Sequence, residues 1–334
     1  MKKNPEVSIV IPVYNVEKFL PQALDSLLLQ TFPDFEAVCV NDGSSDGCGR
    51  ILNDYARKDS RFKVINQKNQ GVSAARNAAL DAVRGNYIAF LDPDDWIHVR
   101  FLEIMLKKIK QEKADIVWCD TVRITDREPY KTVPLSDPPE SFDVADPLER
   151  FILQKTPYPK GALWDKLFKA ELFDNLRFET GIHVAEDFIL MFSVLRKVRK
   201  AVYINAALKY YRVHEGSLMC AGLTDRYIDD HIAAYLLLKT RSADFSLPKK
   251  TEKVLARRLV KMLYRACVCS PYKKAPDRLV FRFWEKYSAV LAQMEQKGEF
   301  NPALLDFRKR FLTRLFLRGK FKLLRFFLKI RRLK

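Results

Sequence analysis

The sequence predicts an α/β fold with a mostly parallel sheet flanked by helices, followed by a helical C-terminal region. Short apolar runs alternate with segments of helical periodicity over the first 120 residues, an order typical of parallel sheets with right-handed crossovers. The first run, at residues 7–13, is continuously apolar, which predicts a strand buried on both faces. From Asp225 onward the pattern is helical throughout.

The individual elements follow from where the periodicity changes. Apolar runs predict strands at residues 7–13, 35–40, 62–65, 87–91 and 116–119. Amphipathic segments between them predict helices at residues 17–30, 50–58, 71–83 and 97–111. Asn15 precedes the first helix and is expected to cap it. Residues 41–47 combine Asn, Asp, Gly and Ser, which favour a turn.

Composition divides the chain into three regions. Residues 129–147 are rich in proline and acidic residues and predict a loop or a boundary. We therefore expect a catalytic domain at residues 1–220, a helical region at residues 221–307 and a basic tail at residues 308–334. The six cysteines form no Cys-x-x-Cys pair, which fits a reducing cytoplasm. No uncharged apolar stretch reaches 18 residues, so we expect no spanning helix.

The basic tail has a distinctive pattern. The chain carries a net charge of +18, and residues 308–334 hold twelve Lys or Arg and no acid. Apolar and basic residues recur there at helical spacing on separate stripes, which favours a helix lying in an anionic membrane interface. The alternative is a basic helix packed on the protein's own core. Nucleic-acid binding is not expected, because no nucleic-acid motif accompanies the charge.

The most informative segment is Leu-Asp-Pro-Asp-Asp-Trp at residues 91–96. Asp92, Asp94 and Asp95 follow an apolar run that predicts a buried strand. Carboxylates gathered there repel one another unless a cation lies among them. Oxygen ligands suit Mg²⁺ or Mn²⁺, which usually bind phosphate oxygens as well. The alternative is a helix N-terminus capped by Asp94 or Asp95.

Further residues have two possible roles each. Asp42 ends a predicted strand, where it either accepts a hydrogen bond from a nucleotide base or caps its own turn. Arg76 either reaches a phosphate or packs on the surface. Glu186 and Asp187 precede an apolar helix, so they either favour its N-terminus or supply a general base. No zinc spacing, Walker sequence, Gly-x-Gly-x-x-Gly turn or Gly-x-Ser-x-Gly elbow is present.

Four segments together resemble family 2 glycosyltransferases. They are residues 7–15 (Val-Ser-Ile-Val-Ile-Pro-Val-Tyr-Asn), 40–46 (Val-Asn-Asp-Gly-Ser-Ser-Asp), 69–77 (Asn-Gln-Gly-Val-Ser-Ala-Ala-Arg-Asn) and 91–96. Their order and spacing over about 110 residues carry the resemblance. Weaker similarity continues to residue 217, through Glu186 and Asp187. Asp165, where many relatives carry Asn, departs from the family pattern.

The resemblance implies a glycosyltransferase A fold, a nucleotide diphosphate sugar donor, commonly a UDP-sugar, and Mn²⁺ or Mg²⁺. It implies Asp95 as the direct metal ligand, with Asp94 also near the ion, and Asp187 as the general base. The residues implied at the nucleotide sugar are Pro12, Tyr14, Asn15, Asp42, Ser44, Asn69, Arg76, Asp92 and Asp94.

We therefore predict an inverting, metal-dependent hexosyltransferase or similar enzyme of cell-surface polysaccharide or lipopolysaccharide synthesis. Its acceptor is expected to be a hydroxyl of a glycan or lipid-linked molecule, reached from the cytoplasmic face of the membrane. Two alternatives remain: a non-catalytic, membrane-associated nucleotide-binding scaffold, and a sugar nucleotidyltransferase. The second is disfavoured by Pro12-Val13-Tyr14-Asn15, which is unlike the Gly-rich loop that such enzymes carry after the first strand.

Overall fold

A computed structural model describes residues 4–125, 139–157, 159–214, 224–243, 247–264 and 277–318. The chain falls into two compact units, residues 1–217 and residues 218–334.

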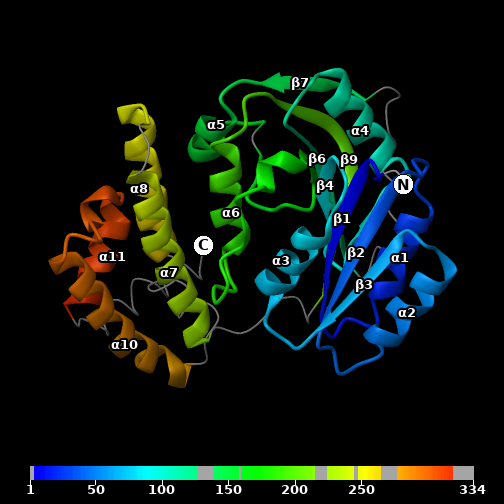
Figure 1. Cartoon of the computed structure of the whole chain (residues 1–334). Helices are drawn as coiled ribbons and strands as arrows, with labels where there is room; N and C mark the ends of the chain where they lie inside the picture. The colour runs from blue at the N-terminus through cyan, green and yellow to red at the C-terminus, as the bar shows by residue number, and fades with distance from the viewer. Residues whose placement is uncertain are drawn as a thin grey trace. The chain divides into compact units, whose positions relative to one another are not determined.

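The first unit is built on a mixed sheet (Figure 1). In the described part of the chain it has nine strands: β1 (Val7–Val13), β2 (Phe35–Asp42), β3 (Phe62–Gln67), β4 (Tyr87–Phe90), β5 (Trp96–Ile97), β6 (Ile116–Thr125), β7 (Ser141–Val144), β8 (Lys166–Lys169) and β9 (Ala201–Val213). The strand order is β3-β2-β1-β4-β8-β6-β9-β5, and β7 pairs with β9. β1 to β4, β6 and β9 run in one direction, and β5, β7 and β8 run against them. The predicted α/β fold is confirmed.

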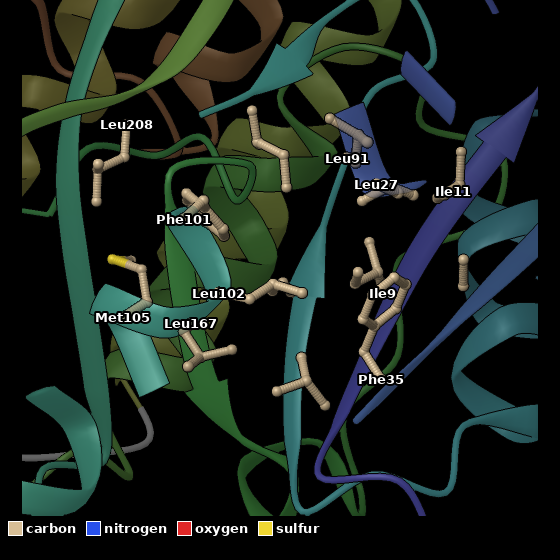
Figure 2. Close-up of a cluster of buried hydrophobic side chains, with 14 of the residues drawn as sticks. Ile9, Ile11, Leu27, Phe35, Leu91, Phe101, Leu102, Met105, Leu167 and Leu208 are labelled. Atoms are coloured by element: carbon tan, nitrogen blue, oxygen red, sulfur yellow. The ribbon is translucent and has the colours of Figure 1, made fainter. Parts of the chain in front are cut away.

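Helices cover both faces of the sheet. They are α1 (Leu20–Leu28), α2 (Cys48–Lys58), α3 (Val72–Ala82), α4 (Phe101–Gln111), α5 (Pro147–Leu153) and α6 (Glu186–Leu195), with a short 3₁₀ turn at Ala170–Phe173. Because side chains alternate along a strand, Ile9 and Ile11 of β1 face a core shared with α1, α2 and α4 (Figure 2). α3 packs on β1 and β2 from the other side, through the small residues Ala75 and Ala79.

Two local predictions were wrong. The helix predicted from residue 97 begins at Phe101, because Trp96 and Ile97 form β5, which pairs with β9. Its N-cap is Arg100, so neither Asp94 nor Asp95 caps it. Asn15 does not cap α1, which begins at Leu20.

The second unit is helical, as predicted. It contains α7 (Asp225–Ala243), α8 (Lys249–Leu263), α10 (Asp277–Gln296), a 3₁₀ turn at Pro302–Leu304 and α11 (Phe307–Leu317). Tyr287 of α10 is fully buried, and its hydroxyl lies 3.0 Å from carboxylate oxygens of both Asp225 and Asp229 on α7. These contacts join α10 to α7. No helix in the described segments has the length and hydropathy needed to cross a bilayer.

The start of the predicted basic tail forms α11. Leu312 and Phe316 are buried, whereas Phe311 is 41% exposed. Arg314 lies 2.8 Å from Glu295 of α10. This part of the tail therefore packs on its own unit, as the alternative interpretation held. Residues 319–334, which contain the remainder of the predicted membrane helix, lie outside the described residues.

Candidate functional site

The polar segments predicted from the sequence meet at one edge of the sheet. The register pairs Val13 with Asn41 and Val10 with Phe90, so β1, β2 and β4 end close together. Asn15, Asp42 and Asp92 lie at or just beyond these strand ends. The carboxyl ends of parallel strands are where ligands bind in α/β sheets.

Asp42 organises the turn before α3. Its side chain is buried and accepts hydrogen bonds from Gln67 Nε2 at 2.6 Å, from the Gln70 amide at 2.9 Å and from the Gly71 amide at 2.8 Å. Gly71 has a φ of +89°, which a residue with a side chain rarely adopts. Asp42 therefore holds the turn leading to Arg76, and retains acceptor capacity for a further donor.

Three loops interlock beside this turn. Asn15 has a φ of 48°. Its backbone N–H donates to Ser44 Oγ at 3.1 Å, and its side-chain Oδ1 accepts from the backbone N–H of Ser45 at 2.8 Å. Gly43 lies so close to the third loop that an added Cβ would fall 2.7 Å from the Asn69 nitrogen. The structure thus brings together Asn15, Ser44 and Asn69. Pro12 is buried in β1, and Tyr14 is 49% exposed.

Arg76 of α3 lies at the centre of three carboxylates. Its Nη2 is 3.0 Å from Asp92 Oδ1, and its Nη1 is 2.9 Å from Glu186 Oε1 and 3.0 Å from Asp187 Oδ1. The Arg76 side chain is only 7% exposed. Burial lowers the pKa of Arg76, but the three carboxylate partners raise it by more than burial lowers it. The guanidinium therefore stays charged. Arg76 Nε is buried and has no hydrogen-bond partner among the described residues.

Asp187 is the carboxylate whose ionisation is most disturbed in this group. Burial raises the pKa of Asp187 to about 8, the neighbouring acids raise it too, and Arg76 opposes the rise. Neither acid at the start of α6 caps the helix, because the N-cap is Ala185 in a left-handed conformation with no side-chain cap bond. A carboxylate with this pKa, 25% exposed, has the properties of a general base.

Asp95 occupies a different environment from Asp92 and Asp94. Its side chain is fully buried and lies 3.1 Å from Nζ of Lys209, which is also fully buried. Its Oδ1 accepts the Arg212 amide at 2.9 Å. Burial raises the pKa of Asp95 to about 6, although Lys209 opposes this. Asp95 therefore joins the acidic segment to β9.

The sequence pointed to Tyr210-Tyr211-Arg212 without giving these residues a role, and it gave none to Lys209 or His214. His214 follows β9, and its Nε2 lies 3.1 Å from Asp94 Oδ2. Arg212 donates from Nε to the Asp94 carbonyl at 3.0 Å and packs over the Trp96 ring at 4.7 Å. The pairing of Trp96 with Tyr210 creates these contacts. A polar stretch at the end of a long apolar strand was the available signal.

The residues fit a divalent cation at Asp94 better than at Asp95. The Asp94 side chain is 25% exposed, and its Oδ1 has no hydrogen-bond partner among the described residues. The imidazole of His214, next to Asp94, could serve as a second metal ligand. An ion at Asp95 would have to displace a buried ammonium. In the described residues no three His, Cys, Asp or Glu are grouped as a metal site. Mg²⁺ usually takes one or two carboxylates and completes its shell with phosphate oxygens and water.

The Glycosyl transferase family 2 profile matches residues 8–199, more than half of the chain. The chain belongs to glycosyl transferase family 2. It is 37% identical over 223 residues to glycosyltransferase GlyA of Streptococcus pneumoniae, covering 65% of this chain and 32% of GlyA. It is 37% identical over 226 residues to the uncharacterized glycosyltransferase EpsJ of Bacillus subtilis, covering 64% of this chain and 63% of EpsJ. The chain thus spans less than two thirds of either relative.

The solved structures extend the likeness to the fold of this family 2 chain. The crystal structure of S. aureus TarS residues 1–349 in complex with UDP-GlcNAc has a TM-score of 0.74 at 21% identity, covering 98% of this chain and 91% of that one. The mannosyltransferase PcManGT from Pyrobaculum calidifontis, in complex with GDP-Man and Mn²⁺, has a TM-score of 0.53 at 16% identity. The predicted glycosyltransferase A fold is confirmed.

Proposed function

We propose that this family 2 chain is an inverting glycosyltransferase that moves a sugar from a nucleotide diphosphate sugar, with a UDP-sugar favoured, to an acceptor hydroxyl in cell-surface glycan synthesis. The observation that carries the proposal is the cluster in which Arg76 joins Asp92 to Asp187. This cluster places Asp92, which we assign to the nucleotide-sugar donor, near Asp187, which we assign to the acceptor hydroxyl. The TarS complex with UDP-GlcNAc supports the choice of a UDP-sugar.

Asp187 is proposed as the general base. The acceptor hydroxyl must lose a proton as it attacks the anomeric carbon, and a carboxylate with a raised pKa is well matched to take it near neutral pH. Attack from the face opposite the leaving group inverts the anomeric centre. Glu186 shares Arg76 Nη1 with Asp187 and thereby limits how far the guanidinium neutralises the base.

The leaving nucleoside diphosphate is proposed to be bound by Arg76 and by the acidic segment through a divalent cation. The buried Nε–H of Arg76 is a donor that a diphosphate oxygen would satisfy. Asp94 and His214 are the residues we propose to hold Mn²⁺ or Mg²⁺, which would neutralise the charge that develops on the diphosphate. Asp42, Asn15, Ser44 and Asn69 would form the nucleoside side of the site.

A lipid-linked acceptor and a cytoplasmic position at the membrane are proposed from the basic tail at residues 308–334. Because α11 is packed on its own unit through Leu312 and Phe316, the membrane contact would fall mainly to residues 319–334. Seven Lys or Arg remain among residues 319–334, with Phe and Leu between them, a composition suited to an anionic interface.

Donor binding and turnover can be tested on the purified chain. The expected result is a rise in melting temperature with UDP-sugars in the presence of Mn²⁺, and transfer of labelled sugar to a membrane extract. Asp94→Asn and His214→Gln should each raise the Mn²⁺ concentration needed for half-maximal activity, while Asp81→Asn, on the surface, should not. A rise in melting temperature with a nucleotide sugar, without transfer of any of the labelled sugars, would favour the scaffold alternative.

A further inference from the structure

Helix α8 carries a row of basic residues on one side. Lys249, Lys253, Arg257 and Lys261 follow one another at intervals of four residues, and Lys250 lies beside them. All five are exposed, and they are called the basic row below. The opposite side of α8 is buried in the second unit, through Thr251, Leu255, Leu259, Val260 and Leu263.

The basic row is unfavourable for the helix that carries it. Like charges four residues apart repel along a helix surface. Lys249 and Lys250 stand in the first turn, where the helix dipole disfavours cations. Among the described residues, Lys253 and Arg257 form no ion pair that would offset this, and the same holds for the two lysines of the first turn. Local conflicts of this kind are expected where a sequence serves a function.

The charge of the basic row determines the class of partner. The chain's own C-terminal residues, 319–334, contain seven Lys or Arg and no acid, so they would be repelled. A second copy of a chain with net charge +18 is disfavoured for the same reason. Single-stranded nucleic acid is usually held by aromatic side chains between the basic ones, and the basic row contains none.

We propose that the basic row of α8 rests on the anionic headgroups of a lipid bilayer. From Lys249 to Lys261 it extends over about 18 Å of the helix axis and about 120° of its circumference, a face from which long Lys and Arg side chains reach one charged surface. Since the apolar side of α8 is already buried in its own unit, the helix docks on headgroups and does not insert. This inference does not depend on the transfer reaction.

The test is binding of the full chain to vesicles of phosphatidylcholine with 30 mol% phosphatidylglycerol, measured by co-sedimentation at low and physiological salt. The variant Lys249→Gln/Lys250→Gln/Lys253→Gln/Arg257→Gln keeps residues with good helix propensity. About fivefold in affinity is expected per basic residue near an anionic leaflet, so the variant should bind at least about a hundredfold more weakly. Binding of the unaltered chain should weaken with salt and be absent on pure phosphatidylcholine.

The matched control removes four exposed cations from the first unit, through Arg50→Gln, Arg57→Gln, Lys58→Gln and Lys63→Gln. It should keep vesicle affinity within about threefold, because these residues lie outside the second unit. Both variants are checked by circular dichroism and melting temperature. Equal losses in the two variants would overturn the proposal, since general charge attraction would then suffice. An unchanged affinity of the α8 variant would overturn it too, as would loss of oligonucleotide binding with vesicle binding intact.

Discussion

Nη1 of Arg76 lies 3.0 Å from Oδ1 of Asp187, although the two residues are 111 positions apart. The same guanidinium holds Asp92, which follows β4. One side chain of α3 thus connects the proposed donor residues to the proposed base, and it does so from within the segment that Asp42 and the Gly71 turn position.

Replacing Asp187 by Asn should remove proton transfer and leave the donor site in place. We expect kcat to fall by roughly 10²- to 10⁴-fold, the usual contribution of a positioned general base. UDP affinity, measured by calorimetry, should change little. Glu171→Gln, on an exposed side chain, serves as the control. Loss of UDP binding together with activity would instead assign Asp187 to the donor.

The pH dependence of kcat/KM should report the ionisation of Asp187 in the free enzyme. A base works only when it is deprotonated, so kcat/KM should rise about tenfold per pH unit at low pH and level off above the pKa of Asp187, which burial raises to about 8. Because Arg76 opposes this rise, residual activity of Arg76→Gln should level off at higher pH. A flat profile from pH 6 to 8 would exclude this role for Asp187.

The same carboxyl should also make stability depend on pH. A folded-state pKa raised above the unfolded value means that the folded chain holds this proton more tightly. Its stabilising contribution is complete below about pH 3.8 and is lost as the pH rises through about 8. Asp187→Asn should therefore stabilise the chain more at pH 8.5 than at pH 5.5, as measured by urea unfolding. An equal effect at both values would contradict the raised pKa.

Asp42→Asn should loosen the turn before α3. The amide that replaces one carboxylate oxygen cannot accept from a backbone N–H, so one of the three hydrogen bonds is lost in a buried site. We expect a cost of about 1–3 kcal/mol in the free energy of unfolding, and weaker UDP binding. Asp54→Asn, in a surface ion pair, should stay within about 0.5 kcal/mol.

Lys209→Met should be among the most damaging single changes. It leaves the Asp95 carboxylate buried without its cation, which typically costs about 3–5 kcal/mol. The double variant Lys209→Met/Asp95→Asn should lose less than the sum of the two single variants, because the uncompensated charge is gone. Arg50→Met, from an exposed pair, should cost below about 1 kcal/mol. Strict additivity in the double variant would contradict the coupling.

The sequence was informative where chemistry and local pattern coincide. The polar segments around Asp42 and Asp92 were predicted at one sheet edge, because strand periodicity and the βα order determine where parallel strands end. The partners of Asp95 and Asp94 were not predicted. Lys209 and His214 reach them only because β9 pairs with β5, and pairing between residues more than 110 positions apart leaves no trace in local periodicity.

Repulsion among the acids was also a weaker argument for a metal than the sequence implied. Asp92 is bound by Arg76, and Asp95 lies against Lys209. Asp94 has His214 beside it. The protein therefore supplies a basic group to each carboxylate, and the case for a divalent cation depends on the free oxygen of Asp94 and on the chemistry of the leaving diphosphate.

Asn77, next to Arg76 on α3, exchanges two hydrogen bonds with the backbone of Phe178, at 3.0 Å and 2.8 Å. The stretch that leads to Glu186 and Asp187 is thereby fastened to α3 and not only to the sheet beneath it. Anyone grafting residues 178–187 from a relative to alter acceptor choice would need to transplant the matching face of α3 as well. Residues 178–187 and the contacting face of α3 should therefore be exchanged together, although about a hundred residues of chain separate them.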